Sequence, residues 1–204
     1  MLLLFYIFFM VRLCTPQVFP FSLNQQQQDN VCGCIPAKSV SEFYRAEAKY
    51  EREFSKYPEH AGIITSETVR EWEKIYKKKA NKIAVNSQRM KGTPEDSIYS
   101  LTGYIYHAKM NKNDCDLHLE IGTENKNTLR AVAEITKDNC KLQEQIIQQL
   151  KEKGFVIGKQ NATGIKCTVR GLGFYDGKHP GKKNKKHEKG SAWEIHPVIS
   201  MELE

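Results

Sequence analysis

The sequence predicts an α+β protein in which residues 97–204 form a five-stranded β-barrel behind an N-terminal helical segment. Three observations lead to this fold class. Five runs in this part of the chain alternate apolar and polar residues, as strands with one buried face do. One amphipathic helical run separates the third strand from the fourth. Glycines at positions 103, 171 and 173 interrupt the strands, as sharply bent barrel strands require.

Residues 1–30 are expected to be a signal or anchor segment with a Gln-rich spacer. The apolar run 2–11 has the length of a signal-peptide core and is shorter than the roughly 20 residues of a membrane span. No Lys or Arg precedes it, and no clear cleavage site follows. We expect a protein that is exported or membrane-anchored in the bacterial envelope, and the alternative is a cytosolic protein or a mis-assigned start.

Residues 31–96 are expected to be a helical appendage and linker. One helix is predicted over 39–57, with Ser39 as N-cap and Glu42 completing a capping box. A second is predicted over 65–85, with Thr65 or Ser66 as cap. Acids cluster early in this second helix and lysines late, which suits the helix dipole without any ligand.

The barrel domain then contains five strand-like runs and one clear helix. The five runs span residues 98–110, 115–122, 128–136, 164–177 and 193–203. The helix is predicted over 137–154, with Gly154 as its stop. Pro197 cannot donate to a strand ladder, so it belongs at a sheet edge or a bulge. The order β-β-β-α-β-β is that of the OB-fold, a five-stranded Greek-key barrel. An open α+β sheet is the runner-up.

Polar residues on the strands form a candidate metal site. With the apolar sets inside the barrel, they are expected on its outer, solvated face, which explains the alternation without any chemistry. The carboxylates and imidazoles that neighbouring strands could bring together are Asp116, His118, Glu134, Glu194 and His196. Such a group could hold a divalent metal and activate water for phosphodiester hydrolysis, although no spacing here is diagnostic and no particular metal is indicated. A third interpretation is a hydrogen-bonded network that locks the second strand to the fifth.

A Lys-rich stretch between the last two strands is a candidate nucleic-acid site. Its lysines are Lys178, Lys182, Lys183, Lys185, Lys186 and Lys189, and only Glu188 opposes them. Arg170 is added as a further cation, and Asp176 and His179 lie at the end of the fourth strand. In an OB-fold this loop commonly helps to bind oligonucleotides or oligosaccharides.

Aromatic residues near this loop could offer stacking surfaces, and they are Tyr104, Tyr106, Phe174 and Tyr175. The net charge of +7 also favours an anionic partner. The leading prediction is a non-enzymatic domain that binds single-stranded nucleic acid or another polyanion, and the alternative is a solvated charge run.

Six cysteines are present, and Cys14 would be lost with a signal peptide. In an exported protein some of the others could form disulfides. The spacing of Cys32 and Cys34 is a weak zinc signal. Cys115 and Cys167 lie on the apolar phase of strand-like runs, which predicts buried free thiols.

From about residue 97 onward, four groups of residues match motifs of a known family. They are Asp114, Asp116, His118 and Leu119; Ala133, Glu134, Ile135 and Cys140; Val169, Gly171, Gly173, Phe174, Tyr175, Asp176 and His179; and Glu194, Ile195, His196, Pro197 and Val198. In these motifs the chain resembles a family of mostly uncharacterised, often exported bacterial proteins. The resemblance implies an OB-like C-terminal domain and no established activity. The Lys-rich loop and the segment 39–90 have no counterpart in it.

Overall fold

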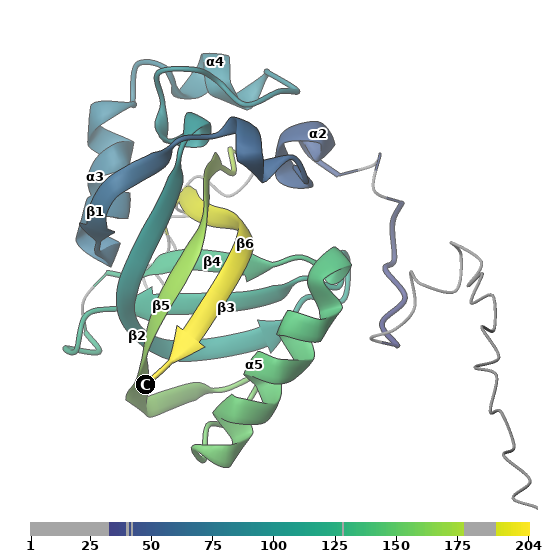
Figure 1. Ribbon diagram of the computed structural model, residues 1–204, viewed down its shortest axis with the longest axis vertical. Helices are drawn as coiled ribbons and strands as arrows, with labels where there is room; N and C mark the ends of the chain where they lie inside the picture. Colours follow the sequence, from purple (N-terminus) through teal and green to yellow (C-terminus); the bar gives the residue numbers. More distant parts are fainter. Residues whose placement is uncertain (1–32, 40, 42, 128, 178–190) are drawn as a thin grey trace, which may run out of the picture.

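Five strands close into a barrel in the computed structural model, which describes residues 33–39, 41, 43–127, 129–177 and 191–204 (Figure 1). The strands are β2 (Ile98–Met110), β3 (Leu117–Gly122), β4 (Ala131–Ile135), β5 (Gln160–Tyr175) and β6 (Trp193–Leu203). Hydrogen bonding follows the order β2-β3-β4-β6-β5, and a β2–β5 pairing closes the ring. Only β4 and β6 run parallel among the barrel pairs. The predicted OB-like barrel is therefore confirmed.

Alternating side chains from each strand fill the barrel. Leu117, Leu119 and Ile121 of β3 are fully buried, as the sequence pattern predicts. Each such side chain stabilises the fold by about 1.5–3 kcal/mol. Helix α5 (Cys140–Glu152) follows the short 3-10 helix η4 (Lys137–Asn139) and packs Ile146 and Leu150 into the same core. Helix α5 thus lies between β4 and β5, where a helix was predicted.

Close backbone approach explains two of the predicted glycines. A Cβ atom at Gly103 would lie 2.6 Å from the carbonyl oxygen of Gly122, and one at Gly171 would lie 2.6 Å from that of Pro197. The β5–β6 register also shifts at this point, and the peptide bond before Pro197 is cis. The placement of Pro197 at a bulge is confirmed.

The N-terminal segment is much less helical than predicted. Instead of one helix over 39–57, it has α2 (Ala46–Lys49), the 3-10 helix η2 (Phe54–Lys56) and strand β1 (Glu59–Ile64), which pairs parallel with β2. Arg45 interrupts any helix because its backbone is left-handed, with φ of 51°. Glu42 lies outside the described residues. The long-range contacts of this segment outweigh its local helical pattern.

The second predicted helix is present in two pieces. Helix α3 (Ser66–Ile75) begins at Thr65, whose side chain forms a capping box with Thr68. Helix α4 (Ala80–Ala84) follows after a turn, and another 3-10 helix, η3 (Pro94–Asp96), precedes β2. The lysines at 77–79 in the turn are exposed, so no packed face holds a helix there. In the described part of the chain no helix is long and apolar enough to span a membrane, and the apolar run 2–11 lies outside that part.

Candidate functional site

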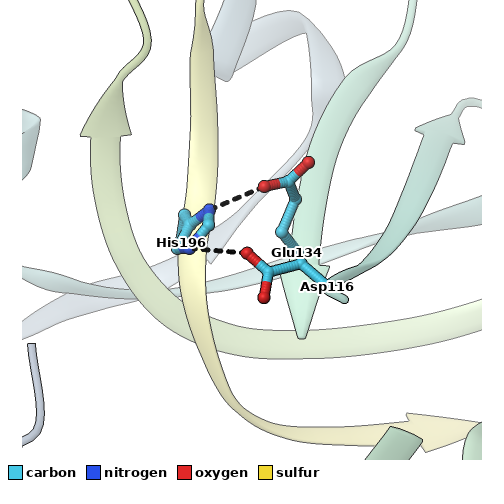
Figure 2. A group of neighbouring side chains, drawn as sticks. All are labelled: Asp116, Glu134 and His196. Atoms are coloured by element: carbon cyan, nitrogen blue, oxygen red, sulfur yellow. Dashed lines mark ion pairs between the residues drawn. The ribbon is translucent and has the colours of Figure 1, made fainter. Parts of the chain in front are cut away.

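The structure brings the five candidate metal residues together on one side of the barrel. His118 of β3 lies opposite Glu134 of β4, and the parallel β4–β6 pairing places Glu194 and His196 beside them. The Glu134 carboxylate lies 2.9 Å from His118 Nδ1 and 2.9 Å from His196 Nδ1. Glu194 Oε1 lies 3.2 Å from His196 Nδ1. Asp116 Oδ2 lies 3.8 Å from His196 Nε2 (Figure 2). We call these five residues the polar cluster.

The expectation that the polar cluster faces solvent is wrong for four of its five residues, and only His118 is partly exposed. Asp116 and His196 are 0% exposed, because the segment that carries α2 covers this face of the barrel. Lys49 reaches into the cluster from α2 and donates to Asp114 Oδ2 at 2.9 Å. Its Nζ atom also lies 3.6 Å from Asp116 Oδ2 and 3.6 Å from Glu134 Oε2. Sequence reasoning missed Lys49 because nothing in its local pattern marks it as buried.

Two arginines hold the covering segment against the barrel. Arg45 forms a buried, bidentate ion pair with Glu95, at 2.5 and 2.8 Å. Arg89 donates to the backbone oxygen of Ala48 in α2 at 2.7 Å and to that of His196 in β6 at 2.6 Å. Hydrogen bonds that involve a charged group are among the strongest in proteins. The cover is therefore part of the folded domain.

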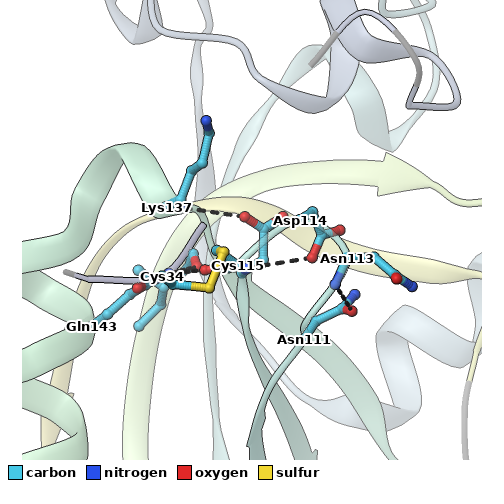
Figure 3. The surroundings of a disulfide bond; sticks show 9 residues. Cys34, Asn111, Asn113, Asp114, Cys115, Lys137 and Gln143 are labelled. Atoms are coloured by element: carbon cyan, nitrogen blue, oxygen red, sulfur yellow. Dashed lines mark hydrogen bonds between the residues drawn. A yellow bond between two sulfur atoms is a disulfide. The ribbon is translucent and has the colours of Figure 1, made fainter. Parts of the chain in front are cut away.

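A disulfide fixes the same segment at a second point. Cys34 is bonded to Cys115 in the loop that precedes β3, next to Asp114 (Figure 3). The prediction of a free thiol at Cys115 is wrong, because this residue lies in a loop with φ of 63° and not on the apolar face of a strand. Cys167 is buried and free, as predicted. Cys32 lies outside the described residues.

Burial and neighbouring charges shift the pKa values of the cluster residues in opposite directions. Burial lowers the pKa of His196, but its contacts with Glu134 and Glu194 outweigh this and raise that pKa to about 9. Burial raises the pKa of Asp116. For Glu134, burial raises the pKa, and hydrogen bonds from His118 and His196 more than reverse that effect, so the net pKa lies well below normal. The cluster is a closely balanced set of buried charges.

A pocket of about 660 Å³ lies beside the polar cluster. It lies between the covering segment, the start of α5 and the middle of β6. Tyr50 and Pro197 contribute to its wall, and their chain neighbours Lys49 and His196 belong to the buried contacts described above. The Tyr50 ring also packs edge-on against the His196 ring, with 6.2 Å between centroids. None of the five cluster residues lines the pocket, so the Tyr50 ring and Pro197 lie between the two.

A second site is a basic surface at the opposite end of the barrel from α5, at the top of Figure 1. Exposed lysines gather on the α3–α4 segment, and they are Lys74, Lys77, Lys78, Lys79 and Lys82. No acidic residue occurs between positions 74 and 94. We call this set the helical lysines. Favourable interaction with the helix dipole, which was the prediction for these lysines, does not by itself explain so many exposed lysines in one segment.

The Lys-rich connection starts and ends against the same α3–α4 segment. The lysines between 178 and 189, together with His179, lie outside the described residues. At its start, a Cβ placed on Gly177 would lie 3.0 Å from Cβ of Ala84 in α4. At its end, Glu73 of α3 accepts hydrogen bonds from Ser191 Oγ at 2.9 Å and from the Ala192 amide at 2.7 Å. The described residues on either side of the Lys-rich connection thus both contact the segment that carries the helical lysines.

The other predicted binding residues are placed differently. Arg170 forms an ion pair with Glu59 of β1, so its guanidinium group already has a carboxylate partner. Phe174 is buried against the His196 ring, and Tyr106 is buried with its hydroxyl donating to the backbone oxygen of Thr123, so neither ring can stack on a base. Asp176 is half-buried, and its amide donates to the carbonyl oxygen of Ala192. Of these four residues, only Phe174 and Asp176 lie at the root of the β5–β6 connection.

No protein-family model matches this chain, and no curated protein does. The resemblance to an exported bacterial family therefore remains a prediction from the motifs.

Proposed function

We propose that this domain is a non-enzymatic module that binds polyanions, with single-stranded nucleic acid as the main candidate, at the basic end of the barrel. The observation that carries the proposal is the anchoring of the Lys-rich connection on the α3–α4 segment through Glu73 and Gly177. Both ends of the stretch that carries six lysines in the sequence therefore lie against the helical lysines' own segment.

Electrostatics favours polyanion binding at this end of the barrel over binding on the side that carries the polar cluster. Lysines neutralise backbone phosphates without reading base edges, so binding would be generic and would weaken as salt rises. OB-folds commonly bind oligonucleotides on the face of their second and third strands. Here that face carries Glu120 and Glu134, and its polar cluster is covered by Lys49 and Tyr50. Both carboxylates are already paired, with Arg130 and Lys49 respectively, whereas the exposed helical lysines are accessible to a phosphate backbone.

The compartment we propose is the bacterial envelope. The Cys34–Cys115 disulfide supports it, because disulfides form and persist in oxidising compartments. The apolar run 2–11 supports a signal or tether at the N-terminus.

The test is binding of a fluorescein-labelled oligothymidylate to the full chain, followed by anisotropy across a salt series. We expect log K to fall with log salt by about 0.7 for each phosphate neutralised. The triple variant Lys74→Gln, Lys77→Gln, Lys78→Gln should bind about tenfold or more weakly at low salt, with a slope shallower by about 2.

A matched control removes the same charge from the other end of the barrel. Lys141, Lys151 and Lys153 are exposed on or directly after α5, and their triple Gln variant should bind like the wild type. Equal losses in both variants would show that net charge alone acts. No binding at low salt would end the proposal.

The convergence of Asp116, Glu134 and His196 favours a second candidate, a metal-dependent phosphodiesterase. Donor atoms from these three residues all lie within 4.8 Å of one another. A substrate would reach them only after Lys49 and Tyr50 had moved. Release of nitrophenol from bis-p-nitrophenyl phosphate with added Mn²⁺ or Zn²⁺ tests this candidate, and activity that Asp116→Asn leaves unchanged would contradict it.

A further inference from the structure

Two polar atoms face each other inside the polar cluster and have no hydrogen-bond partner among the described residues. They are Asp116 Oδ2 and His196 Nε2. Both side chains are 0% exposed, and the two atoms are 3.8 Å apart. That distance is too long for a direct hydrogen bond. Buried polar groups almost always form a hydrogen bond, so two facing polar atoms that form none indicate that a further atom or ion can bind between them.

The other side of the His196 ring is arranged as in metal-binding histidines. Its Nδ1 atom contacts Glu134 at 2.9 Å and Glu194 at 3.2 Å. Metal-binding histidines usually donate the ring N–H that does not bind the metal to a carboxylate, which orients the ring and leaves the second nitrogen for the ion. With Nδ1 so engaged, Nε2 is directed toward Asp116 (Figure 2).

We propose that Asp116, Glu134 and His196 form a binding site for a divalent transition-metal ion, and that the Lys49 ammonium group is the cation that neutralises this site when no metal is bound. One donor atom from each of the three residues lies within 4.8 Å of the other two. Ligand atoms of a four-coordinate zinc ion lie about 3.4 Å apart, so the side chains must turn to close the site. In that arrangement Glu134 turns from His196 Nδ1 to the ion, and Glu194 remains the carboxylate that orients the ring. The proposal is independent of polyanion binding.

The donor set also selects the class of ion. One imidazole and two carboxylates suit Zn²⁺ or a similar first-row ion, whereas Mg²⁺ and Ca²⁺ prefer oxygen ligands alone. We therefore expect Zn²⁺ to bind much more tightly than Mg²⁺.

Lys49 is the competing cation. Its Nζ atom lies 3.6 Å from Asp116 Oδ2 and 3.6 Å from Glu134 Oε2, both of which belong to proposed ligands. Its hydrogen bond goes to Asp114, which is not a proposed ligand, so the ammonium group keeps a partner when a metal enters. Like charges this close repel each other strongly away from bulk water. Removing the Lys49 charge should therefore strengthen metal binding.

The test is calorimetric titration of Zn²⁺ into the untagged full chain and three variants. Lys49→Met should bind at least about tenfold more tightly than the wild type. Asp116→Asn should bind at least about tenfold more weakly, because the neutral amide is a poor ligand of nearly the same shape. His107→Gln is the matched control, since His107 of β2 pairs with Glu120 of β3 at 3.1 Å but lies outside the donor group, and it should bind like the wild type.

Two outcomes overturn the proposal. One is the absence of Zn²⁺ binding in both the wild type and Lys49→Met at millimolar zinc. The other is Asp116→Asn binding as tightly as the wild type, which would assign the zinc to other residues such as His179 and His187. Binding by Lys49→Met alone would support the site, with Lys49 dominating it in the wild type. If Asp116→Asn does not fold, as judged by circular dichroism, Glu134→Gln replaces it with the same expectation.

Discussion

Glu95 offers the sharpest test of how the covering segment is held. Its carboxylate is fully buried and accepts four hydrogen bonds. Two come from the Arg45 guanidinium, at 2.5 and 2.8 Å, and the others come from the amides of Met90 at 3.1 Å and Tyr175 at 3.0 Å. One side chain thus joins the covering segment, the linker before β2 and the end of β5.

The substitution Glu95→Gln keeps the shape and removes the charge. One carboxylate oxygen is replaced by an amide nitrogen that cannot accept, so a buried Arg45 guanidinium loses its counter-charge. Breaking a buried pair in this way costs about 3–5 kcal/mol. For a chain of this size each kcal/mol lowers Tm by about 2–4 °C, so we expect a fall of about 6–20 °C.

Thermal unfolding followed by circular dichroism measures the effect. The matched control is Glu204→Gln, which breaks a pair with Lys166 whose two side chains are about half exposed. Such surface pairs contribute at most about 1 kcal/mol. A Glu95→Gln variant that melts within about 3 °C of the wild type, or no lower than the control, would refute the role given to this ion pair.

Three further predictions concern the cover and the cluster. Cys34→Ser should lower the free energy of unfolding by up to about 4 kcal/mol in urea, because it opens a covalent loop with a sequence separation of 81, and equal stability would contradict this. His196→Ala should lower Tm sharply, because Glu134 and Glu194 lose their shared partner. Oligonucleotide binding by the folded variant should stay unchanged. Loss of that binding would argue that the basic end is not a separate binding site. Although burial opposes it, hydrogen bonds from the Glu53 amide, Lys56 and Tyr57 lower the pKa of Glu51 to about 2. Glu51→Gln should therefore be less stable than the wild type above pH 4.5, with the difference fading as the pH falls toward 2, and a difference that persists at pH 2 would contradict that cause.

The barrel strands were predictable because their signal is local. The first and last runs match β2 and β6 from end to end, since alternating apolar residues report directly on a half-buried strand. Strand β1 was missed because the stretch around Gly62 has no such alternation, and it is held by pairing with β2. The broken helix at Arg45 was missed for the same reason, since its conformation depends on a contact fifty residues away at Glu95.

The convergence of the polar residues was predictable, and their burial was not. The alternation of Asp116 and His118 with leucines gives the same pattern for a wet face and for a covered one. The segment that covers the cluster places Lys49 over it, and the local sequence around Lys49 does not predict this position. Likewise, each lysine run is plain in the sequence, but the contact of Glu73 with Ser191 at the end of the second run is not.

The most direct test of the basic end is an amide chemical-shift map of the ¹⁵N-labelled full chain titrated with an unlabelled oligothymidylate at low salt. We expect the shifts to concentrate in the segments 74–82 and 191–193 and to disappear at high salt. Shifts concentrated on β3 and β4, or none at low salt, would contradict binding at the basic end.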